Sequence, residues 1–279
     1  MKSENYDFTI SGAGLVGSLL ALVLDQIGYK VCLVEKSNIE SSKNQSDNFY
    51  PLSLNYRSKI ILEDFGLWNQ VAKISYPINE LTITYRNNLS KIELTSEDVG
   101  LEHLGFVVDR NKLLQVYRKS IDKNLTGDVK YKSEIQSVKR QKKYLAISTN
   151  TQSFNSKYLL VSDGIESELS KLVSRDVEKV DYNQKSFMLN CNGTFRQNLA
   201  IQFFNSSGIF ALIPYSNSSA SLILTLNKNQ ENRYFIDGEP IKNKIINTFS
   251  QYITSVEELK LITSYNLATH RMNEIYNDR

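Results

Sequence analysis

The sequence predicts an α/β fold in which a parallel sheet, built on a βαβ unit, is interleaved with a second, mixed β-sheet. Strand, helix and strand patterns alternate over residues 7–36, which is typical of a parallel sheet. The apolar period then changes to two over residues 81–94. Between residues 185 and 226 several strand-like segments follow one another without a helix, which indicates a separate mixed or antiparallel sheet.

The first βαβ unit is complete in the sequence. Phe8 to Ser11 is predicted as a short apolar strand, Leu15 to Gly28 as a helix, and Val31 to Val34 as the second strand. A GxGxxG pattern joins the first strand to the helix, and an acidic residue ends the second strand. This arrangement predicts a dinucleotide site; the alternative is a glycine turn without a ligand, which does not require the acid.

Each residue of this pattern has an expected physical role. Gly12 permits the tight turn, Gly14 lets the backbone approach a pyrophosphate, and Gly17 allows the helix to pack closely on the strand. The helix N-terminus faces the phosphates, and Glu35 accepts hydrogen bonds from a ribose. The expected contacts with the nucleotide also include Ala13, Val16 and Lys36.

Composition excludes several classes of function. The 279 residues carry 33 basic and 30 acidic groups, and the net charge of +3 does not predict nucleic-acid binding. The longest apolar run, Leu15 to Leu24, is too short to span a bilayer, and no signal peptide is expected. Cys32 and Cys191 are expected to be reduced, and His103 and His270 do not suggest a metal site. We therefore expect a cytoplasmic protein, either free or peripheral at the membrane.

The next elements are predicted in chain order. Residues 37–48 are expected to form a polar loop. Residues 58–69 are expected to form a helix with Ile61, Leu62 and Phe65 near one face and Gly66 close to its end. Two strands, residues 81–85 and 91–94, are expected to form a hairpin around Asn87 and Asn88.

The remaining elements include one further helix before the second sheet. Residues 105–108 are predicted as a strand, and Asn111 as the cap of a helix that returns the chain to the first domain. The later strands are expected at residues 134–138, 144–149, 158–161, 185–191, 199–204, 209–214 and 219–226. Residues 241–252 and a polar tail close the chain.

Several stretches together resemble the FAD-dependent aromatic hydroxylases, and within them the hydroxylases of ubiquinone biosynthesis. They are SGAGLVGSLLA with Glu35, SLNYRSKIILEDFGLW, GFVVDRNKLL, YLLVSDGIES, DYNQKSFMLNCN and the segment from Ile201 to Tyr215. The resemblance implies an FAD/NAD(P)-binding domain interleaved with a substrate domain. The expected segments are the FAD-binding domain at 1–75 and 101–178, an inserted β-hairpin at 76–100, the substrate-domain sheet at 179–264 and a return segment at 265–279.

The resemblance also implies a function and further site residues. NAD(P)H would reduce the FAD, and the flavin would then pass a hydroxyl group from O2 to an electron-rich ring. Asp163 and Gly164 would contact both the flavin and the pyridine nucleotide, and Arg110 would approach the flavin. The alternatives are an ordinary turn at Asp163 and a surface cation at Arg110. No catalytic side chain is identified.

An apolar pocket for a prenylated phenol, an intermediate of ubiquinone biosynthesis, is implied at one segment of the second sheet. The expected substrate contacts are Phe203, Phe210, Leu212 and Pro214. The alternative is that these alternating residues fill the core of the sheet.

The sequence also departs from the family pattern. Tyr50 stands where the family has an arginine, and Ser170, beside Lys171, stands where a second arginine is expected. The family's Gly-Asp flavin motif does not occur, which predicts a truncated or split hydroxylase that requires a separately encoded C-terminal half or other ubiquinone-biosynthesis proteins. Two other hypotheses stay open, a non-catalytic nucleotide-binding or assembly subunit and a decayed remnant.

Overall fold

The computed structural model describes residues 4–38, 48–85, 90–164, 167–170, 177–230, 241–272 and 274–276. The chain divides into two compact units. Unit 1 comprises Met1–Ser46, Asn111–Lys179 and His270–Arg279, and unit 2 comprises Asp47–Arg110 and Val180–Thr269. Residues 47–75 and 101–110, which the sequence analysis assigned to the FAD-binding part, therefore cluster with unit 2. The reason is strand pairing, because the strands at residues 51–55 and 105–109 form a small sheet with the strand at residues 75–78, which leads into the expected hairpin.

Unit 1 is built on a six-stranded sheet with the order β8-β2-β1-β11-β10-β9. β1 pairs in parallel with β2 and β11, and β2 pairs in parallel with β8. β10 pairs antiparallel with both β11 and β9. The first strand therefore lies between β2 and β11 in the interior of the sheet. The elements are β1 (Asn5–Ser11), α1 (Leu15–Gln26), β2 (Val31–Glu35), α4 (Arg110–Asn124), β8 (Asp128–Tyr131), β9 (Ile135–Arg140), β10 (Leu145–Thr149) and β11 (Ser153–Val161).

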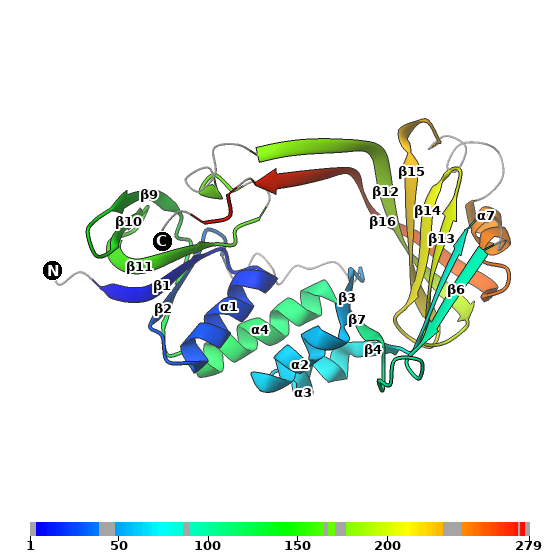
Figure 1. Cartoon of the computed structure of the whole chain (residues 1–279), viewed down its shortest axis with the longest axis horizontal. Helices are drawn as coiled ribbons and strands as arrows, with labels where there is room; N and C mark the ends of the chain where they lie inside the picture. Colours follow the sequence, from blue (N-terminus) through cyan, green and yellow to red (C-terminus); the bar gives the residue numbers. More distant parts are fainter. Residues whose placement is uncertain are drawn as a thin grey trace. The chain divides into compact units, whose positions relative to one another are not determined.

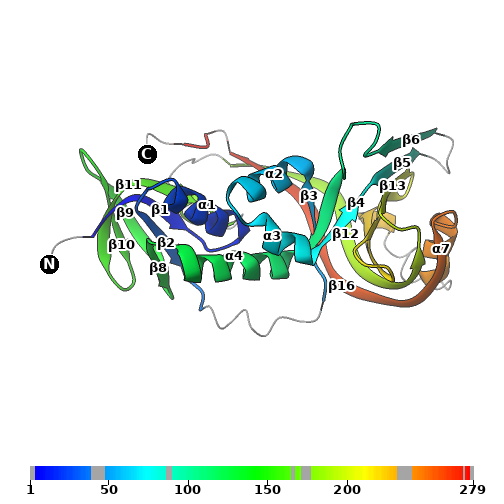
Figure 2. The same ribbon diagram turned by 90° about the horizontal axis from the view of Figure 1, so that it is seen from below.

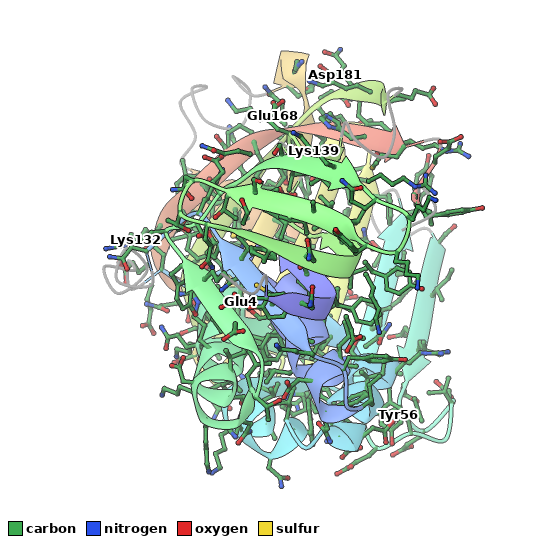
Figure 3. All side chains as sticks on the ribbon, turned by 90° about the vertical axis from the view of Figure 1, so that its left-hand side faces the viewer. Glu4, Tyr56, Lys132, Lys139, Glu168 and Asp181 are labelled. Atoms are coloured by element: carbon green, nitrogen blue, oxygen red, sulfur yellow. The ribbon has the colours of Figure 1, made fainter. Side chains whose placement is uncertain are left out.

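Helices α1 and α4 lie side by side on the sheet (Figures 1 and 2). α1 buries Ala21 and Leu22 and contacts β1 and β2. A core cluster includes Cys32, Ile147 and Phe154. At its edge the Tyr6 hydroxyl lies within hydrogen-bonding distance of the carboxylates of Asp128 (2.6 Å) and Glu4 (2.8 Å), the latter labelled in Figure 3. Apolar packing thus fixes the sheet from which the glycine turn projects.

Unit 2 contains two sheets. The larger has the order β16-β12-β15-β14-β13-β5-β6, and the smaller has the order β3-β7-β4. β13 pairs in parallel with β5, whereas β12, β15, β14 and β13 run antiparallel in turn, so the larger sheet is mixed, as predicted. The elements are β3 (Pro51–Asn55), α2 (Tyr56–Asp64), α3 (Trp68–Val71), the 3-10 helix η2 (Ala72–Ile74), β4 (Ser75–Ile78), β5 (Glu80–Tyr85), β6 (Ser90–Thr95), β7 (Gly105–Asp109), β12 (Val177–Phe195), β13 (Leu199–Asn205), β14 (Gly208–Pro214), β15 (Ser219–Asn227), the 3-10 helix η3 (Lys228–Gln230), α7 (Ile241–Thr248) and β16 (Ile253–Met272).

The hairpin expected over residues 81–94 is confirmed. β5 and β6 pair antiparallel from Glu80↔Thr95 to Tyr85↔Ser90. Asn87 and Asn88, the expected turn residues, lie outside the described residues. Most of the expected 37–48 loop, Ile165 and Lys171 lie outside them as well.

The helix expected over residues 58–69 ends close to Gly66, as predicted, but starts earlier than predicted. The expected helix over residues 58–69 is divided into α2 and α3, because Gly66 adopts a left-handed φ of 69° between them. The start is also earlier, because the Asn55 side chain accepts a hydrogen bond from Ser58 N (2.8 Å) and caps α2. Ile61 is 40% exposed, whereas Leu62 is buried.

Two further expectations need correction. Helix α4 begins at Arg110, so Asn111 lies in its first turn and is not its cap. The polar tail is in fact the 20-residue strand β16, adjacent to β12 (Figure 2). Its burial is confined mainly to its start, at Ile253 and Val256, so apolar alternation was too weak to reveal it.

Candidate functional site

The glycine turn lies at the carboxyl end of β1, where packing requires two of its glycines. Gly12 has a φ of 94°, and a Cβ there would lie 2.7 Å from Asp163 Cα. A Cβ on Gly17 would lie 1.9 Å from the carbonyl oxygen of Gly12. Because ordinary carbon–oxygen contacts are much longer, both positions exclude a side chain.

Gly14 differs from its two neighbours in the pattern. A Cβ on Gly14 would meet no protein atom within 4 Å, so packing within the chain does not require glycine there. Helix α1 follows it with no side-chain cap and no acidic residue in its first turn, and Val16 is 63% exposed. The open turn therefore fits a group that approaches the backbone closely, and the helix N-terminus favours an anion.

Glu35 is held against the same turn from the end of β2. Its Oε2 atom accepts a hydrogen bond from Ala13 N (2.8 Å), and its Oε1 atom accepts one from Ser37 N (2.8 Å). These two bonds fix the carboxylate while leaving each oxygen a lone pair for a further donor. Ala13 is 2% exposed, whereas Lys36, which follows Glu35 in the chain, is exposed. The carboxylate is thus fixed beside the glycine turn.

Asp163 and Gly164 follow β11, the other neighbour of β1. The Ser162 hydroxyl donates to the carbonyl oxygen of Ser11 (2.8 Å), and the Ser11 hydroxyl donates to Asp163 Oδ2 (3.4 Å). Asp163 and Gly164 are exposed, and Gly164 has a φ of 99°. The structure therefore brings Asp163 to the Gly12 turn. Sequence reasoning did not assign a role to Ser11 or Ser162, although both flank the predicted turns.

Arg110 lies in unit 2, exposed at the start of α4. Its backbone N donates to the carbonyl oxygen of Tyr50 (2.9 Å), and Tyr50 N donates to Asp109 Oδ2 (3.0 Å). Tyr50, which stands where the resemblance leads us to expect an arginine, is thus anchored through its backbone to the β7–α4 junction. The approach of Arg110 to a flavin stays a prediction.

The four expected substrate contacts are buried in unit 2. Phe203, Phe210 and Leu212 belong to a core cluster that includes Ile245 and Phe249, from α7 and its C-terminal end, and Pro214 is buried at the end of β14. The cavity beside Phe210 has a volume of about 10 Å³, about enough for one water molecule. This packing corresponds to the sheet-core alternative.

The opposite face of the same sheet is more open. Ile209, Ala211 and Ile213 alternate with the buried residues of β14 and are partly exposed. Phe204 on β13 and Ile223 on β15 lie on this face in register with Ile209 and Ala211. We call these five residues the open face. It offers partly exposed apolar side chains for contact with a ligand.

The two cysteines are free and buried. Burial raises the pKa of the Cys32 thiol to about 12 and that of Cys191 to about 11. Both thiols are therefore protonated at neutral pH and do not supply a thiolate nucleophile.

A family model described as "FAD binding domain" matches residues 5–279. The chain belongs to this FAD-binding family. The open turn at Gly14, the fixed Glu35 carboxylate and the uncapped helix α1 fit FAD, the cofactor of the family, through its adenosine diphosphate part. Contacts of the individual site residues with FAD stay predictions.

Curated relatives include the mitochondrial ubiquinone biosynthesis monooxygenase COQ6 of Xenopus tropicalis. The identity is 24%, over 91% of this chain and 60% of the relative. Ubiquinone hydroxylase UbiM of Neisseria meningitidis is 20% identical, over 82% of this chain and 51% of the relative. The chain thus spans about half the length of the curated relatives it matches.

Solved structures show the same fold at low identity. The p-nitrophenol 4-monooxygenase PnpA of Pseudomonas putida has a TM-score of 0.72 and 12% identity, over 99% of this chain and 71% of that chain. The flavin-dependent monooxygenase PieE, in complex with FAD and substrate, has a TM-score of 0.73 and 13% identity, over 99% of this chain and 52% of that chain. In the described part of the chain, the helices are all too short or too polar to span a bilayer.

Proposed function

We propose that the chain forms the FAD-binding and substrate-binding part of a monooxygenase that hydroxylates an aromatic compound with NAD(P)H and O2. The observation that carries the proposal is the glycine turn, which is open only at Gly14 and has the Glu35 carboxylate fixed beside it. The relatives that act in ubiquinone biosynthesis support a prenylated phenol as the substrate.

The chain's own residues have binding and positioning roles in this proposal. Backbone N–H groups around Gly14 and at the start of α1 bind the pyrophosphate, and Glu35 accepts hydrogen bonds from the ribose hydroxyls. Asp163, which shares a hydrogen bond with Ser11, fixes the turn and contacts the cofactor. FAD, when bound, supplies the redox chemistry.

The substrate ring rests in this proposal on the open face. Phe203, Phe210 and Leu212 support that face from beneath, since they pack against α7. The apolar residues of the open face match the apolar body of a prenylated phenol.

The experiment measures FAD affinity by fluorescence quenching for the wild type and for Gly14→Ala. The methyl group meets no protein atom, so the thermal midpoint should stay within a few degrees of the wild-type value while FAD affinity falls at least tenfold. Glu35→Gln should weaken FAD binding roughly tenfold through the loss of charge-assisted hydrogen bonds, with Glu63→Gln on α2 as the matched control.

Unchanged FAD affinity in both variants would contradict the proposed cofactor site. NAD(P)H oxidation coupled to hydroxylation of a prenylated phenol then tests the reaction. FAD binding without that activity would favour a nucleotide-binding subunit.

A further inference from the structure

Unit 2 contains a second, polar pocket of about 280 Å³, lined by Asn48, Asn190, Asn192, Tyr215, Glu258 and Lys260. The residues come from four places in the chain, namely the segment before β3, strand β12, the end of β14 and strand β16. Such a mixture of amides, a hydroxyl and opposite charges is typical of a site for a polar group, and its volume approaches that of small-ligand pockets.

Asn190, which lines this pocket, carries an unsatisfied acceptor. Its Nδ2 atom donates to the carbonyl oxygen of Phe49 (3.3 Å). This bond fixes the orientation of the Asn190 amide, because the Phe49 carbonyl oxygen can accept a hydrogen bond from the amide nitrogen but not from the amide oxygen. The Oδ1 atom is buried and has no hydrogen-bond partner among the described residues. Buried acceptors are rarely left unpaired, so this atom is suited to a donor from a ligand.

The neighbouring polar groups are already occupied. Asn192 Nδ2 donates to Glu258 Oε2 (3.0 Å), and the Ser219 hydroxyl donates to Asn192 Oδ1 (2.9 Å). Lys260 differs, because within the described ranges its ammonium group forms neither an ion pair nor a hydrogen bond. The pocket therefore offers one buried acceptor and one unpaired cation.

The wall of the pocket is aromatic. The ring of Tyr215 stacks on that of Phe49, with ring centroids 3.7 Å apart and an interplanar angle of 9°. Burial raises the pKa of Tyr215, so its hydroxyl stays protonated and uncharged at neutral pH. The Tyr215–Phe49 ring pair therefore gives the pocket an uncharged wall that suits a flat ligand.

The pocket adjoins the open face of the sheet. Asn190 pairs with Ser221, and Ser221 pairs with Ile213, so Asn190 and Ile213 lie on the same face two strands apart. Met188 and Ile223 are opposite each other in the next register position of that face. A ligand with one polar end in the pocket therefore has its apolar part directed along the open face.

We propose that Asn190 and Lys260 bind the polar end of an aromatic substrate, one that carries both a hydrogen-bond donor and an anionic group. The donor, a hydroxyl or amino group, binds Asn190 Oδ1, and the anion binds the Lys260 ammonium. This inference rests on the proposed function, in which the aromatic ring of the substrate lies on the open face. It makes the two residues determinants of substrate specificity.

The test measures binding of small probes by calorimetry to the purified chain without FAD. The probes are 4-hydroxybenzoate, which has both polar groups, benzoate, which lacks the donor, and phenol, which lacks the anion. We expect 4-hydroxybenzoate to bind at least tenfold more tightly than either of the others. Lys260→Met should remove most of the preference over phenol, whereas Lys139→Met, on strand β9 of unit 1 (Figure 3), should not.

Asn190→Ala should remove the preference for 4-hydroxybenzoate over benzoate. Because the same change removes the hydrogen bond to Phe49, its thermal midpoint is measured in parallel, and the exposed Lys260 provides an independent variant that leaves the fold intact. Equal binding of the three probes, or preferences that persist in both variants, would overturn the inference. Since no flavin is present, these results are independent of whether the chain binds FAD.

Discussion

Replacing Gly17 by alanine should loosen the contact between helix α1 and strand β1. The new methyl carbon would lie 1.9 Å from the Gly12 carbonyl oxygen and 2.5 Å from Ser162 Oγ, whereas ordinary contacts begin at 3.4 Å. The helix start must therefore move by about 1.5 Å, the difference between 3.4 and 1.9 Å. This movement also disturbs the hydrogen bond from Ser162 to Ser11.

The magnitude follows from these contacts. Overpacking costs about 1–3 kcal/mol, and loss of the Ser162 hydrogen bond adds about 1 kcal/mol. The higher helix propensity of alanine offsets up to about 1 kcal/mol. The free energy of unfolding should fall by roughly 1–3 kcal/mol, which corresponds to a decrease of about 3–10 °C in Tm for a chain of this size.

Urea unfolding followed by circular dichroism measures this loss. Gly14→Ala is the matched control, because its methyl group meets no protein atom and its cost should stay below about 1 kcal/mol. If Gly17→Ala proved as stable as Gly14→Ala, close packing would not be the reason for glycine at position 17.

Three further predictions concern stability and reactivity. Asn55→Ala removes the cap of α2 and should lower the free energy of unfolding by about 1 kcal/mol; Asn205→Ala, which removes a part-buried acceptor from the turn after β13, compares the loss of an asparagine side chain outside a helix. The Lys157 ammonium and the Lys30 backbone N–H hold the pKa of Asp7 below its ordinary value of 3.8, so the stabilisation is present above pH 3.8 and is lost as the pH falls through the folded-state pKa. Asp7→Asn should therefore lower the free energy of unfolding at neutral pH but not in strong acid. A loss of stability that does not depend on pH would contradict this explanation. Cys32 and Cys191 should resist a thiol reagent at pH 8 in the native protein and react together in denaturant, since burial raises the pKa of both; rapid native labelling of either would show that its site opens.

The first βαβ unit could be predicted from sequence because its determinants are local. The glycine spacing, the helix and the acidic residue fall within residues 8–35, and each requires only its neighbours for its role. Asp163 was expected from the resemblance to the hydroxylase family, but its position beside Gly12 depends on parallel pairing of β1 with β11, which sequence periodicity does not specify.

Unit 2 was less predictable because its key features are non-local. Alternation in β14 revealed a strand but not which of its faces packs against α7, so Phe210 was expected as a substrate contact with core packing as the open alternative. The polar pocket joins Asn48 to Asn190 and Lys260, which are far apart in sequence. Asn55 was overlooked as a cap because the apolar pattern of the following helix starts later.

Strand β16 is the outer strand of the larger sheet in the described part of the chain, so one of its sides presents backbone groups that no neighbouring strand satisfies. A long edge of this kind can template association with another molecule. Exposed Glu257, Glu258 and Lys260 interrupt it with charges that a second strand would have to desolvate. The polarity that concealed β16 from sequence analysis therefore also protects the sheet against edge-to-edge aggregation.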